Sequence, residues 1–370
     1  MNKSTGPGVS REDLLAACRG EGISSVYQPI IDTARGVVVG YEALIRFPGY
    51  EEKNPEAWLS AARRDGLAAN LEAAALRSAL THKHTLPANC FLTVNTSPDL
   101  LTSPEIRAVW AAQDGLGGLV IEMTEQAPID SYVALEPDLN ALRAAGAVIA
   151  VDDAGSGYAG LQHLLSLKPA MIKIDRELVK NVHRDEAKRA LIGMLGNFAG
   201  RIDAWILAEG VELVEELDAL LSLGVPLVQG YLLGRPAAPW ASLDDDLAHR
   251  MVSNRKPTQA VIVRDVLEAA VTVESPAAAM DAFAADPSRT EVVLVEGQHR
   301  PVAVLTPASA SLAVFNQDLR VNLDTPILDA LSRAVTREQY DRFAPLLVTD
   351  NAGRFAGVAR MERLITALTG

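Results

Sequence analysis

Side chains that carry oxygen stand at the ends of several apolar runs in this sequence. The run "VIAV" at 148–151 ends in Asp152 and Asp153, and the glycine-rich stretch "AGSGYAG" follows at once. Two adjacent carboxylates raise each other's cost of ionisation, so they are either solvated or neutralised by a cation. Oxygen-bearing side chains also end or follow the other apolar runs: Glu42, Asn95, Glu122 and Glu209.

These six residues together suggest a site for hard divalent cations. They offer carboxylate and amide oxygens, with no cysteine or histidine among them, which favours Mg2+, Mn2+ or Ca2+ over zinc. Six ligands exceed what one catalytic ion with open positions needs, whereas two ions about 3.5–4 Å apart would use them. Such a pair suits in-line displacement at a phosphodiester. Lys173 is placed to hold or polarise the attacking water, and Arg46 to grip a phosphate through a bidentate contact.

Each of these residues also has a simpler interpretation. A single acidic residue at a strand end is more often a helix cap or a solvated carboxylate than a metal ligand, and a single lysine can be a surface residue. Six such residues at successive strand ends are hard to explain in that way. The "HKH" stretch at 82–84 is interpreted as solvated charge at a helix end, because its spacing is poor for sharing a ligand on a helix.

The elements that must position these residues alternate in type between about residues 24 and 236. Short apolar runs are separated by amphipathic helical segments, as in α/β folds. In a (β/α)8 barrel the carboxyl ends of the strands meet on one face, where catalytic groups gather. A doubly wound sheet gathers ligands only around its switch point, so a series of polar strand ends fits a closed barrel better. At the start, "SSVYQPII" and "GVVVGYEALIRF" are joined by a short turn, which predicts a hairpin and an irregular barrel.

Composition sets further limits on the class of protein. The chain has 370 residues and a formal net charge of −13, which argues against a basic surface for nucleic acid or anionic membranes. No apolar run approaches the roughly 18–20 residues that span a bilayer, and the N-terminus lacks the apolar segment of a signal peptide. Cys18 and Cys90 are too few for a disulfide framework and suit a reducing compartment. We therefore expect a soluble cytoplasmic protein.

After residue 240 the strand-end pattern of the barrel stops, and the rest of the chain contains a weak internal repeat. "VTVESPAAAMDAF" (271–283) is matched by "VNLDTPILDALSRA" (321–334), and 291–311 is matched by 345–365. Each unit reads as strand, helix, strand, turn, strand, helix, and paired units would bury their faces against each other. We therefore divide the chain into four segments: an N-terminal tail (1–11), a barrel (12–240), a linker (241–262) and a tandem repeat (263–370).

The strand-end motifs resemble those of one known family. In the order and at the spacing of the EAL domain family, the cyclic di-GMP phosphodiesterases, the chain has "YQPI", "YEALIRF", "TVNTS", "IEMTE", "AVDDAGSGY", "IKIDR", "AEGVE" and "QGYLLGRP". The resemblance covers about residues 12–240. It implies an α/β fold with an irregular (β/α)8 TIM-type barrel that hydrolyses cyclic di-GMP to linear pGpG with two Mg2+ or Mn2+ ions. It also implies that Ca2+ inhibits the enzyme and that the protein forms a homodimer.

The resemblance assigns roles to individual residues. The implied metal ligands are Glu42, Asn95, Glu122, Asp152, Asp153 and Glu209. The implied catalytic residues are Lys173, which contacts the water, Glu209 as general base, and Glu212. The implied substrate contacts are Gln28, Arg46, Asp175, Gln229 and Pro236. Glu125 is implied to anchor the loop after Asp153, which in the family couples dimerisation to activity.

The loop after the paired aspartates departs from the family pattern. Ala154 stands where the family usually has phenylalanine, and Ser156 where it usually has threonine, which bears on rate and regulation more than on metal binding. The alternative to an enzyme is a catalytically weak or inactive EAL domain that acts as a cyclic di-GMP receptor. Retention of every motif ligand and of Lys173 favours the enzyme.

The repeat at 263–370 is similar to a pair of divergent cystathionine-β-synthase-type (CBS) modules, most clearly in "PLLVTDNAGRFAGVARMERLI". The similarity implies a smaller α+β module with a regulatory or dimerising role. In one interpretation this module binds an adenine nucleotide.

Overall fold

The chain forms two compact units, Met1–Arg255 and Lys256–Gly370. The computed structural model describes residues 9–47, 55–123, 132–154, 166–202, 204–254, 261–297, 299–313, 315, 319–334, 337, 343–350 and 353–369.

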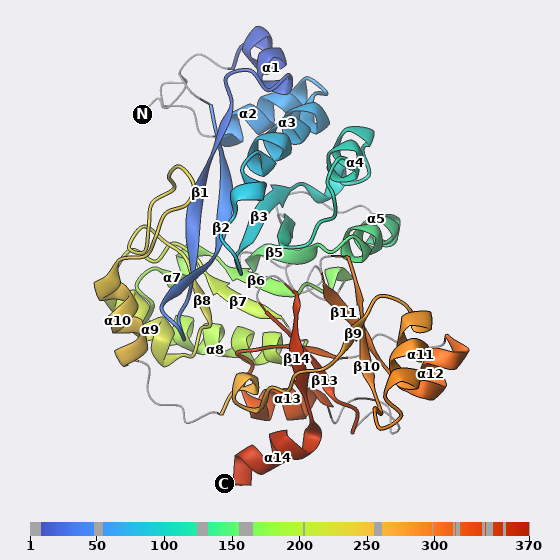
Figure 1. Cartoon of the computed structure of the whole chain (residues 1–370). Helices are drawn as coiled ribbons and strands as arrows, with labels where there is room; N and C mark the ends of the chain where they lie inside the picture. Colours follow the sequence, from blue (N-terminus) through green and yellow to red (C-terminus); the bar gives the residue numbers. More distant parts are fainter. Residues whose placement is uncertain are drawn as a thin grey trace. The chain divides into compact units, whose positions relative to one another are not determined.

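The first unit is built on a closed barrel of strands in sequence order (Figure 1). β1 runs antiparallel to β2 and to β8, and the other neighbouring strands are parallel. The strands are β1 Ser24–Asp32, β2 Val37–Arg46, β3 Phe91–Thr96, β4 Leu119–Met123, β5 Val148–Ala154, β6 Met171–Ile174, β7 Trp205–Ala208 and β8 Leu227–Val228. The antiparallel β1–β2 hairpin confirms the predicted irregular start of an α/β barrel.

Helices follow the strands around the barrel (Figure 1). They are α1 Arg11–Cys18, α2 Pro55–Arg64, α3 Ala68–Leu80, α4 Pro104–Ala111, α5 Tyr132–Ala144, α7 Arg176–Val179, α8 Glu186–Arg201, α9 Val214–Ser222 and α10 Asp245–Asn254, with short 3-10 turns η1 Lys83–Thr85, η2 Pro98–Leu100 and η3 Val182–Arg184. Side-chain caps fix several helix starts. Asp185, for example, accepts from the backbone N–H groups of Ala187 and Lys188 at the start of α8.

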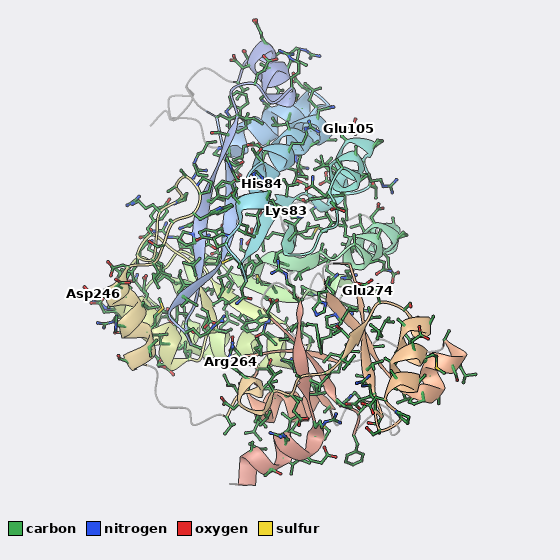
Figure 2. The ribbon with its side chains drawn as sticks, in the orientation of Figure 1. Lys83, His84, Glu105, Asp246, Arg264 and Glu274 are labelled. Carbon is green, nitrogen blue, oxygen red and sulfur yellow. The ribbon has the colours of Figure 1, made fainter. Side chains whose placement is uncertain are left out.

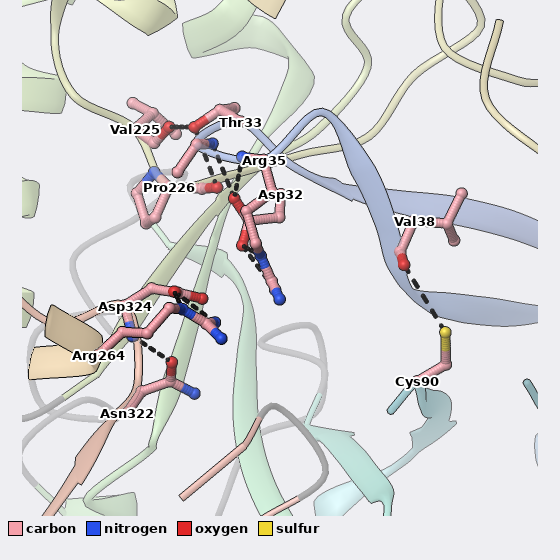
Figure 3. A network of polar contacts seen from close by, with 11 residues as sticks. Asp32, Thr33, Arg35, Val38, Cys90, Val225, Pro226, Arg264, Asn322 and Asp324 are labelled. Atoms are coloured by element: carbon pink, nitrogen blue, oxygen red, sulfur yellow. Dashed lines mark hydrogen bonds and ion pairs between the residues drawn. The ribbon is translucent and has the colours of Figure 1, made fainter. Parts of the chain in front are cut away.

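The turn between β1 and β2 is tied to the chain that leads into β8 (Figure 3). The Thr33 hydroxyl donates to the carbonyl of Val225 at 2.8 Å, and Asp32 accepts from Ala34 N at 2.7 Å and from Arg35 Nε at 2.9 Å. Asp32 and Thr33 are both buried, so these bonds satisfy polar groups that have lost water. They help to close the barrel where its first and last strands meet.

The range 241–262, which the sequence analysis assigns to a linker, contains α10. Met251 of α10 is fully buried in the core of the first unit, and Arg250 donates through Nε to Asp218 of α9 at 3.0 Å. The first compact unit therefore extends to residue 255, beyond the expected boundary at 240. The run "SLDDDLAHR" hides this packing because its acidic residues form the exposed first turn of the helix.

The second unit has the strand–helix–strand–strand–helix order of the repeat twice. Its elements are the 3-10 turn η4 Val263–Val266, then β9 Thr272–Val273, α11 Pro276–Ala285, β10 Val292–Glu296, β11 Arg300–Leu305 and α12 Pro307–Leu312, and then β12 Arg320–Asn322, α13 Ile327–Ala334, β13 Leu346–Thr349, β14 Phe355–Ala359 and α14 Met361–Thr369. The strand orders are β11-β10-β9 and β12-β13-β14, each with one parallel and one antiparallel pair.

The two halves of this second unit bury apolar side chains against each other. Val293 and Val295 of β10 pack with Leu347 of β13 and Val358 of β14. Arg360 adds an ionic link, because it donates to Glu268 at 3.1 Å and to Glu291 at 2.5 Å. Paired units that cover each other's faces are what the repeat predicts.

Two further expectations concern charge and membranes. Lys83, labelled in Figure 2, is half-buried and donates to the carbonyl of Gly115 at 3.0 Å, so the interpretation of "HKH" as solvated charge is wrong for this residue. Burial lowers the pKa of Lys83 below its ordinary value. Within the described ranges, no helix is both long and apolar enough to cross a bilayer.

Glu72 is a buried acidic residue of α3, with 6% of its surface exposed. Its carboxylate accepts a hydrogen bond from Ser97 N at 2.8 Å and so ties α3 to the loop after β3. Burial raises the pKa of this carboxyl to about 7 in spite of that bond. The folded protein therefore holds the proton more tightly than the unfolded chain, where glutamate titrates near about 4.3, and Glu72 lowers stability as the pH rises between these values.

Replacing Glu72 by glutamine is expected to stabilise the protein at pH 8 and to change little at pH 5. The amide oxygen still accepts from Ser97 N, while the cost of burying the ionised carboxylate disappears, so the gain should be about 2–3 kcal/mol larger at pH 8 than at pH 5. Urea unfolding at both pH values measures the gain. Glu136→Gln, at an exposed carboxylate of α5, is the matched control. An equal change in stability at both pH values would contradict ionisation of Glu72 as the cause.

Candidate active site

Strand alternation brings most of the predicted site residues to the inside of the barrel. An interior apolar layer consists of Ile30, Val39, Phe91, Val120, Ala150, Met171, Leu207 and Leu227. Side chains two residues apart on a strand share a face. On each of five strands, the residue two positions after the layer residue is a predicted site residue: Glu122, Asp152, Lys173, Glu209 and Gln229. Asn95 is four residues beyond Phe91, and Gln28 precedes Ile30 by two on the antiparallel first strand.

Glu42 reaches the same interior through a β-bulge. Ile30 pairs with Gly40 and Ile31 pairs with Val38, which leaves Val39 as the extra residue on β2. The bulge shifts the alternation by one, so Gly40 faces the ring of Phe91, which a Cβ there would meet at 2.4 Å. Glu42, two residues further on, then lies with the other carboxylates.

Lys173 lies among four carboxylates inside the barrel. Its Nζ is 2.6 Å from Glu209 Oε1, 2.7 Å from Glu122 Oε2, 3.3 Å from Asp152 Oδ1 and 3.4 Å from Glu42 Oε1. The Lys173 side chain is 1% exposed and that of Glu122 is fully buried. One ammonium group therefore faces four carboxylates in a region with little water.

Two amide side chains complete this cluster. Asn95 Nδ2 donates to Glu42 Oε1 at 3.2 Å, and Gln229 Nε2 donates to Glu42 Oε2 at 2.6 Å and to Gln28 Oε1 at 3.1 Å. Gln28 Nε2 in turn donates to the carbonyl of Gly234 at 2.9 Å. Glu42 thus accepts from both amides and lies beside Lys173, which fixes its carboxylate in one orientation.

The pKa values of the carboxylates follow from burial and from their mutual repulsion. Burial, with help from the charges of Glu42 and Asp152, raises the pKa of Glu122 to about 8 in spite of Lys173. Burial and the same neighbours raise the pKa of Glu209 well above its ordinary value. Burial alone would also raise the pKa of Glu42, but the charge of Lys173 and the hydrogen bonds from Gln229 and Asn95 hold that pKa below its ordinary value. The cluster therefore carries more acidic groups than Lys173 can neutralise.

This cluster has the donor chemistry of a divalent-cation site. The atoms of the cluster that could bind a metal ion are carboxylate and amide oxygens, and Glu122 Oε1 is buried without a hydrogen-bond partner among the described residues. In the described part of the chain no three carboxylate, imidazole or thiol groups surround a common point as metal ligands do, and the Lys173 ammonium lies between the carboxylates instead. The donor set and the excess of acidic groups fit Mg2+ or Mn2+.

Comparison with known proteins identifies the family of this barrel. Residues 11–236, more than half of the chain, match the sequence model of the family described as "EAL domain". The chain belongs to the EAL domain family. The "EAL" of the family name is Glu42–Ala43–Leu44 in this sequence, and Glu42 is the residue that the bulge brings into the barrel.

Several EAL proteins are similar to this chain. The probable cyclic di-GMP phosphodiesterase PdeG of Escherichia coli K12 is 32% identical over 251 residues, which cover 64% of this chain and 48% of PdeG. The chain thus spans about half the length of this curated relative. The solved complex of the PaMucR phosphodiesterase with cyclic di-GMP is 27% identical, with a TM-score of 0.55, and covers 62% of this chain and 97% of PaMucR. Klebsiella pneumoniae BlrP1, solved with manganese and cyclic di-GMP, is 31% identical, with a TM-score of 0.51. The match covers 59% of this chain and 57% of BlrP1.

Some residues predicted from the EAL motifs lie outside the cluster around Lys173. Arg46, at the end of β2, donates to the carbonyl of Ile45 at 2.9 Å. The carboxylate of Asp175 accepts from Glu177 N at 2.7 Å and caps α7. Pro236 is half-buried beside Ala237, which pairs with β1. The Asp153 side chain and all of Glu125 are outside the described residues.

Glu212, predicted to be catalytic, lies at a cavity rather than in the carboxylate cluster. The cavity measures about 220 Å3, and its described lining is Gln28, Glu42, Arg176, Glu209, Gly210, Glu212, Gln229, Gly230 and Tyr231. At this cavity, Glu212 Oε1 is 2.7 Å from Arg176 Nη2. Arg176 and Tyr231 also line the cavity and were not among the residues predicted from the sequence. The signal that could have found them is their position, because Arg176 ends the motif "IKIDR" and Tyr231 is the third residue of "QGYLLGRP".

Proposed function

We propose that this protein hydrolyses cyclic di-GMP to linear pGpG with two Mg2+ or Mn2+ ions. The observation that carries the proposal is the buried Lys173 ammonium within 3.4 Å of four carboxylates. Glu42 and Glu209 of that group also line a cavity of about 220 Å3. The names of the similar EAL proteins, which describe cyclic di-GMP phosphodiesterases and cyclic di-GMP complexes, support the choice of substrate.

In the proposed reaction, water adds to one phosphorus of the cyclic dinucleotide, and the bond from that phosphorus to the 3′ oxygen breaks. Glu209 accepts the proton of the water through a carboxylate oxygen, as a general base within reach of Lys173. Lys173 holds the water, and its charge favours the developing negative charge on the phosphoryl oxygens. The 3′ oxygen takes up a proton from solvent and leaves as a hydroxyl, and the 5′-phosphate stays on pGpG.

The proposed ligands of the two ions are Glu42, Asn95, Glu122, Asp152, Asp153 and Glu209. When bound, the ions would neutralise charge on the phosphoryl oxygens and lower the pKa of the water. Ca2+, a larger ion with looser geometry, is expected to support binding and to inhibit turnover. Gln28 and Gln229 are proposed to contact the substrate, because Gln229 Oε1 is buried without a hydrogen-bond partner beside the cavity. Arg46, Asp175 and Pro236 stay predicted substrate contacts, and Glu212 stays a predicted catalytic residue.

The test of this function is turnover of cyclic di-GMP by the full chain with Mg2+ or Mn2+, with pGpG resolved by chromatography. A parallel calorimetric titration in Ca2+ measures binding without turnover. Product that forms with Mn2+ and not with EDTA supports the proposed enzyme. Tight binding without product with either metal would contradict it and favour the alternative, a cyclic di-GMP receptor whose altered loop at Ala154 and Ser156 separates binding from chemistry.

We also propose that residues 263–370 form a CBS-like pair that regulates the barrel. The support is the repeated strand–helix–strand–strand–helix order and the apolar packing between the two halves. An adenine nucleotide, homodimer formation and a cytoplasmic location are parts of the same proposal. Titration of ATP and AMP during turnover, with light scattering of the full chain, tests the nucleotide and the dimer. Unchanged turnover with both nucleotides would contradict regulation by them.

A further inference from the structure

Glu216 is a buried carboxylate that binds backbone groups of two loops. It belongs to the first turn of α9 and is 2% exposed. Glu216 Oε1 accepts from Asn181 N at 2.8 Å, and Oε2 accepts from Glu212 N and from Leu213 N, each at 3.1 Å. Burial alone would raise the pKa of Glu216, but these three hydrogen bonds outweigh burial and hold the pKa below its ordinary value. The carboxylate is therefore ionised near neutral pH.

The three bonds join two segments that are far apart in sequence. Asn181 lies in the turn after α7 and has a left-handed backbone, with φ of 60°. Glu212 and Leu213 lie between β7 and the start of α9. Leu213 is the N-cap residue of α9 and has no side-chain oxygen to accept a hydrogen bond. Among the residues that the structure describes, Glu216 is the one whose side chain accepts from backbone N–H groups at this helix start.

Each segment carries one member of the ion pair at the cavity. Arg176, at the start of α7, lies 2.7 Å from Glu212, and both line the cavity of about 220 Å3. Of the described residues that line this cavity, Arg176 is the one cation. The stem of Arg176 passes over Gly210, where a Cβ would come within 2.5 Å of Arg176 Cγ. The guanidinium therefore depends on the conformation of both loops.

Glu209 is held by separate bonds. Glu209 N donates to the carbonyl of Ile174 at 3.1 Å, and Val211 N donates to the carbonyl of Gln229 at 3.0 Å, which continue the strand ladder. Loss of Glu216 would therefore release Glu212 and the turn at Asn181 while Glu209 keeps its place beside Lys173. The expected effect falls on the cavity lining and not on the carboxylate cluster.

We propose that Glu216 is a positioning residue, which holds the Arg176–Glu212 pair at the cavity and thereby sets the affinity for an anionic substrate. This inference rests on the proposed function, in which that substrate is cyclic di-GMP, a molecule with two phosphates. Arg176 offers the guanidinium that such a ligand needs, in the form that binds phosphate through two parallel hydrogen bonds.

The test compares Glu216→Gln with Glu215→Gln, a change at the exposed neighbour on the same helix. Glutamine keeps one acceptor oxygen but turns an NH2 group toward backbone donors. The expected result is a KM for cyclic di-GMP raised about tenfold, with a fall in kcat that is clearly smaller than the rise in KM, as for lost binding more than lost chemistry. Hydrogen exchange should be faster at the amides of 181, 212 and 213 in Glu216→Gln alone. An unchanged KM would overturn the proposal.

A second variant separates positioning from stability. Leu213→Thr gives α9 a side-chain N-cap, and the double variant Leu213→Thr with Glu216→Gln should regain thermal stability while its KM stays raised. Recovery of both quantities together would overturn the positioning role and leave a structural one. A wild type that binds cyclic di-GMP in Ca2+ without turnover would refute the proposed enzyme only. In that case a dissociation constant about tenfold weaker in Glu216→Gln is the expected result, and an unchanged constant overturns the inference.

Discussion

Replacing Glu42 by alanine is expected to lower turnover of cyclic di-GMP by at least about three orders of magnitude. The Glu42 carboxylate accepts hydrogen bonds from Asn95 and Gln229 and lies 3.4 Å from Lys173, so it has three polar partners within the cluster. Its loss removes one proposed ligand of the ions and takes one hydrogen-bond acceptor away from each of Asn95 and Gln229. The measurement is kcat with saturating Mn2+, with pGpG resolved by chromatography.

A second substitution separates charge from folding in this experiment. Glu42→Gln keeps an oxygen that can accept from Asn95, so it preserves more of the hydrogen bonding than alanine does. A loss of turnover in both variants, with thermal unfolding of Glu42→Gln close to that of the wild type, assigns the loss to the missing charge. Glu136→Ala on α5, at an exposed site, is the control for a lost carboxylate elsewhere. Near-normal turnover in Glu42→Ala would contradict the proposed two-metal site.

The part of the site that could be predicted follows from strand periodicity. Glu122, Asp152, Lys173 and Glu209 each stand two residues beyond an interior apolar residue at the end of a parallel strand. That pattern is visible in the sequence, because a buried parallel strand reads as an apolar run and its end reads as the first polar residue. The closed barrel could be predicted for the same reason. Successive strands that each end in a polar residue are best explained if all their carboxyl ends meet on one face, as they do in a barrel.

The remaining features depend on contacts that periodicity does not encode. Glu42 faces inward because Val39 is an extra residue in the β1–β2 pairing, and the one signal of that bulge in "GVVVGYEAL" is Gly40, a glycine inside a strand, which does not by itself give the register. Asp175 caps α7, a local use that its motif does not reveal. Glu216 reads as one of several solvated glutamates in "LVEELDALLSLG", and its role requires the turn at Asn181, which is 35 residues away in sequence. Residues whose role depends on a distant backbone group escape a reading of the sequence alone.

Replacing Lys173 by methionine is expected to abolish turnover and to destabilise the metal-free protein by about 3–5 kcal/mol at pH 8. Methionine has a similar length and no charge, so four carboxylates that lie within 3.4 Å of the ammonium would lose their buried cation. The pKa of Glu42, which the charge of Lys173 helps to hold below its ordinary value, would then rise because burial and the repulsion of its neighbours are no longer opposed by the ammonium group. The folded variant would take up protons that the unfolded chain does not hold at this pH.

The sign of the pH dependence follows from that proton uptake. Stability falls as the pH rises wherever the folded state binds more protons than the unfolded state, so the deficit of Lys173→Met should be larger at pH 8 than at pH 5.5. Urea unfolding in EDTA at the two pH values measures the deficit, with Lys180→Met, an exposed lysine after α7, as the control. Adding Mn2+ at pH 8 should then stabilise Lys173→Met more than the wild type, because a divalent cation supplies the charge that the lysine no longer provides. If the loss of stability in Lys173→Met were the same at both pH values and with or without Mn2+, Lys173 would act by packing alone and the carboxylates would not form one charged cluster.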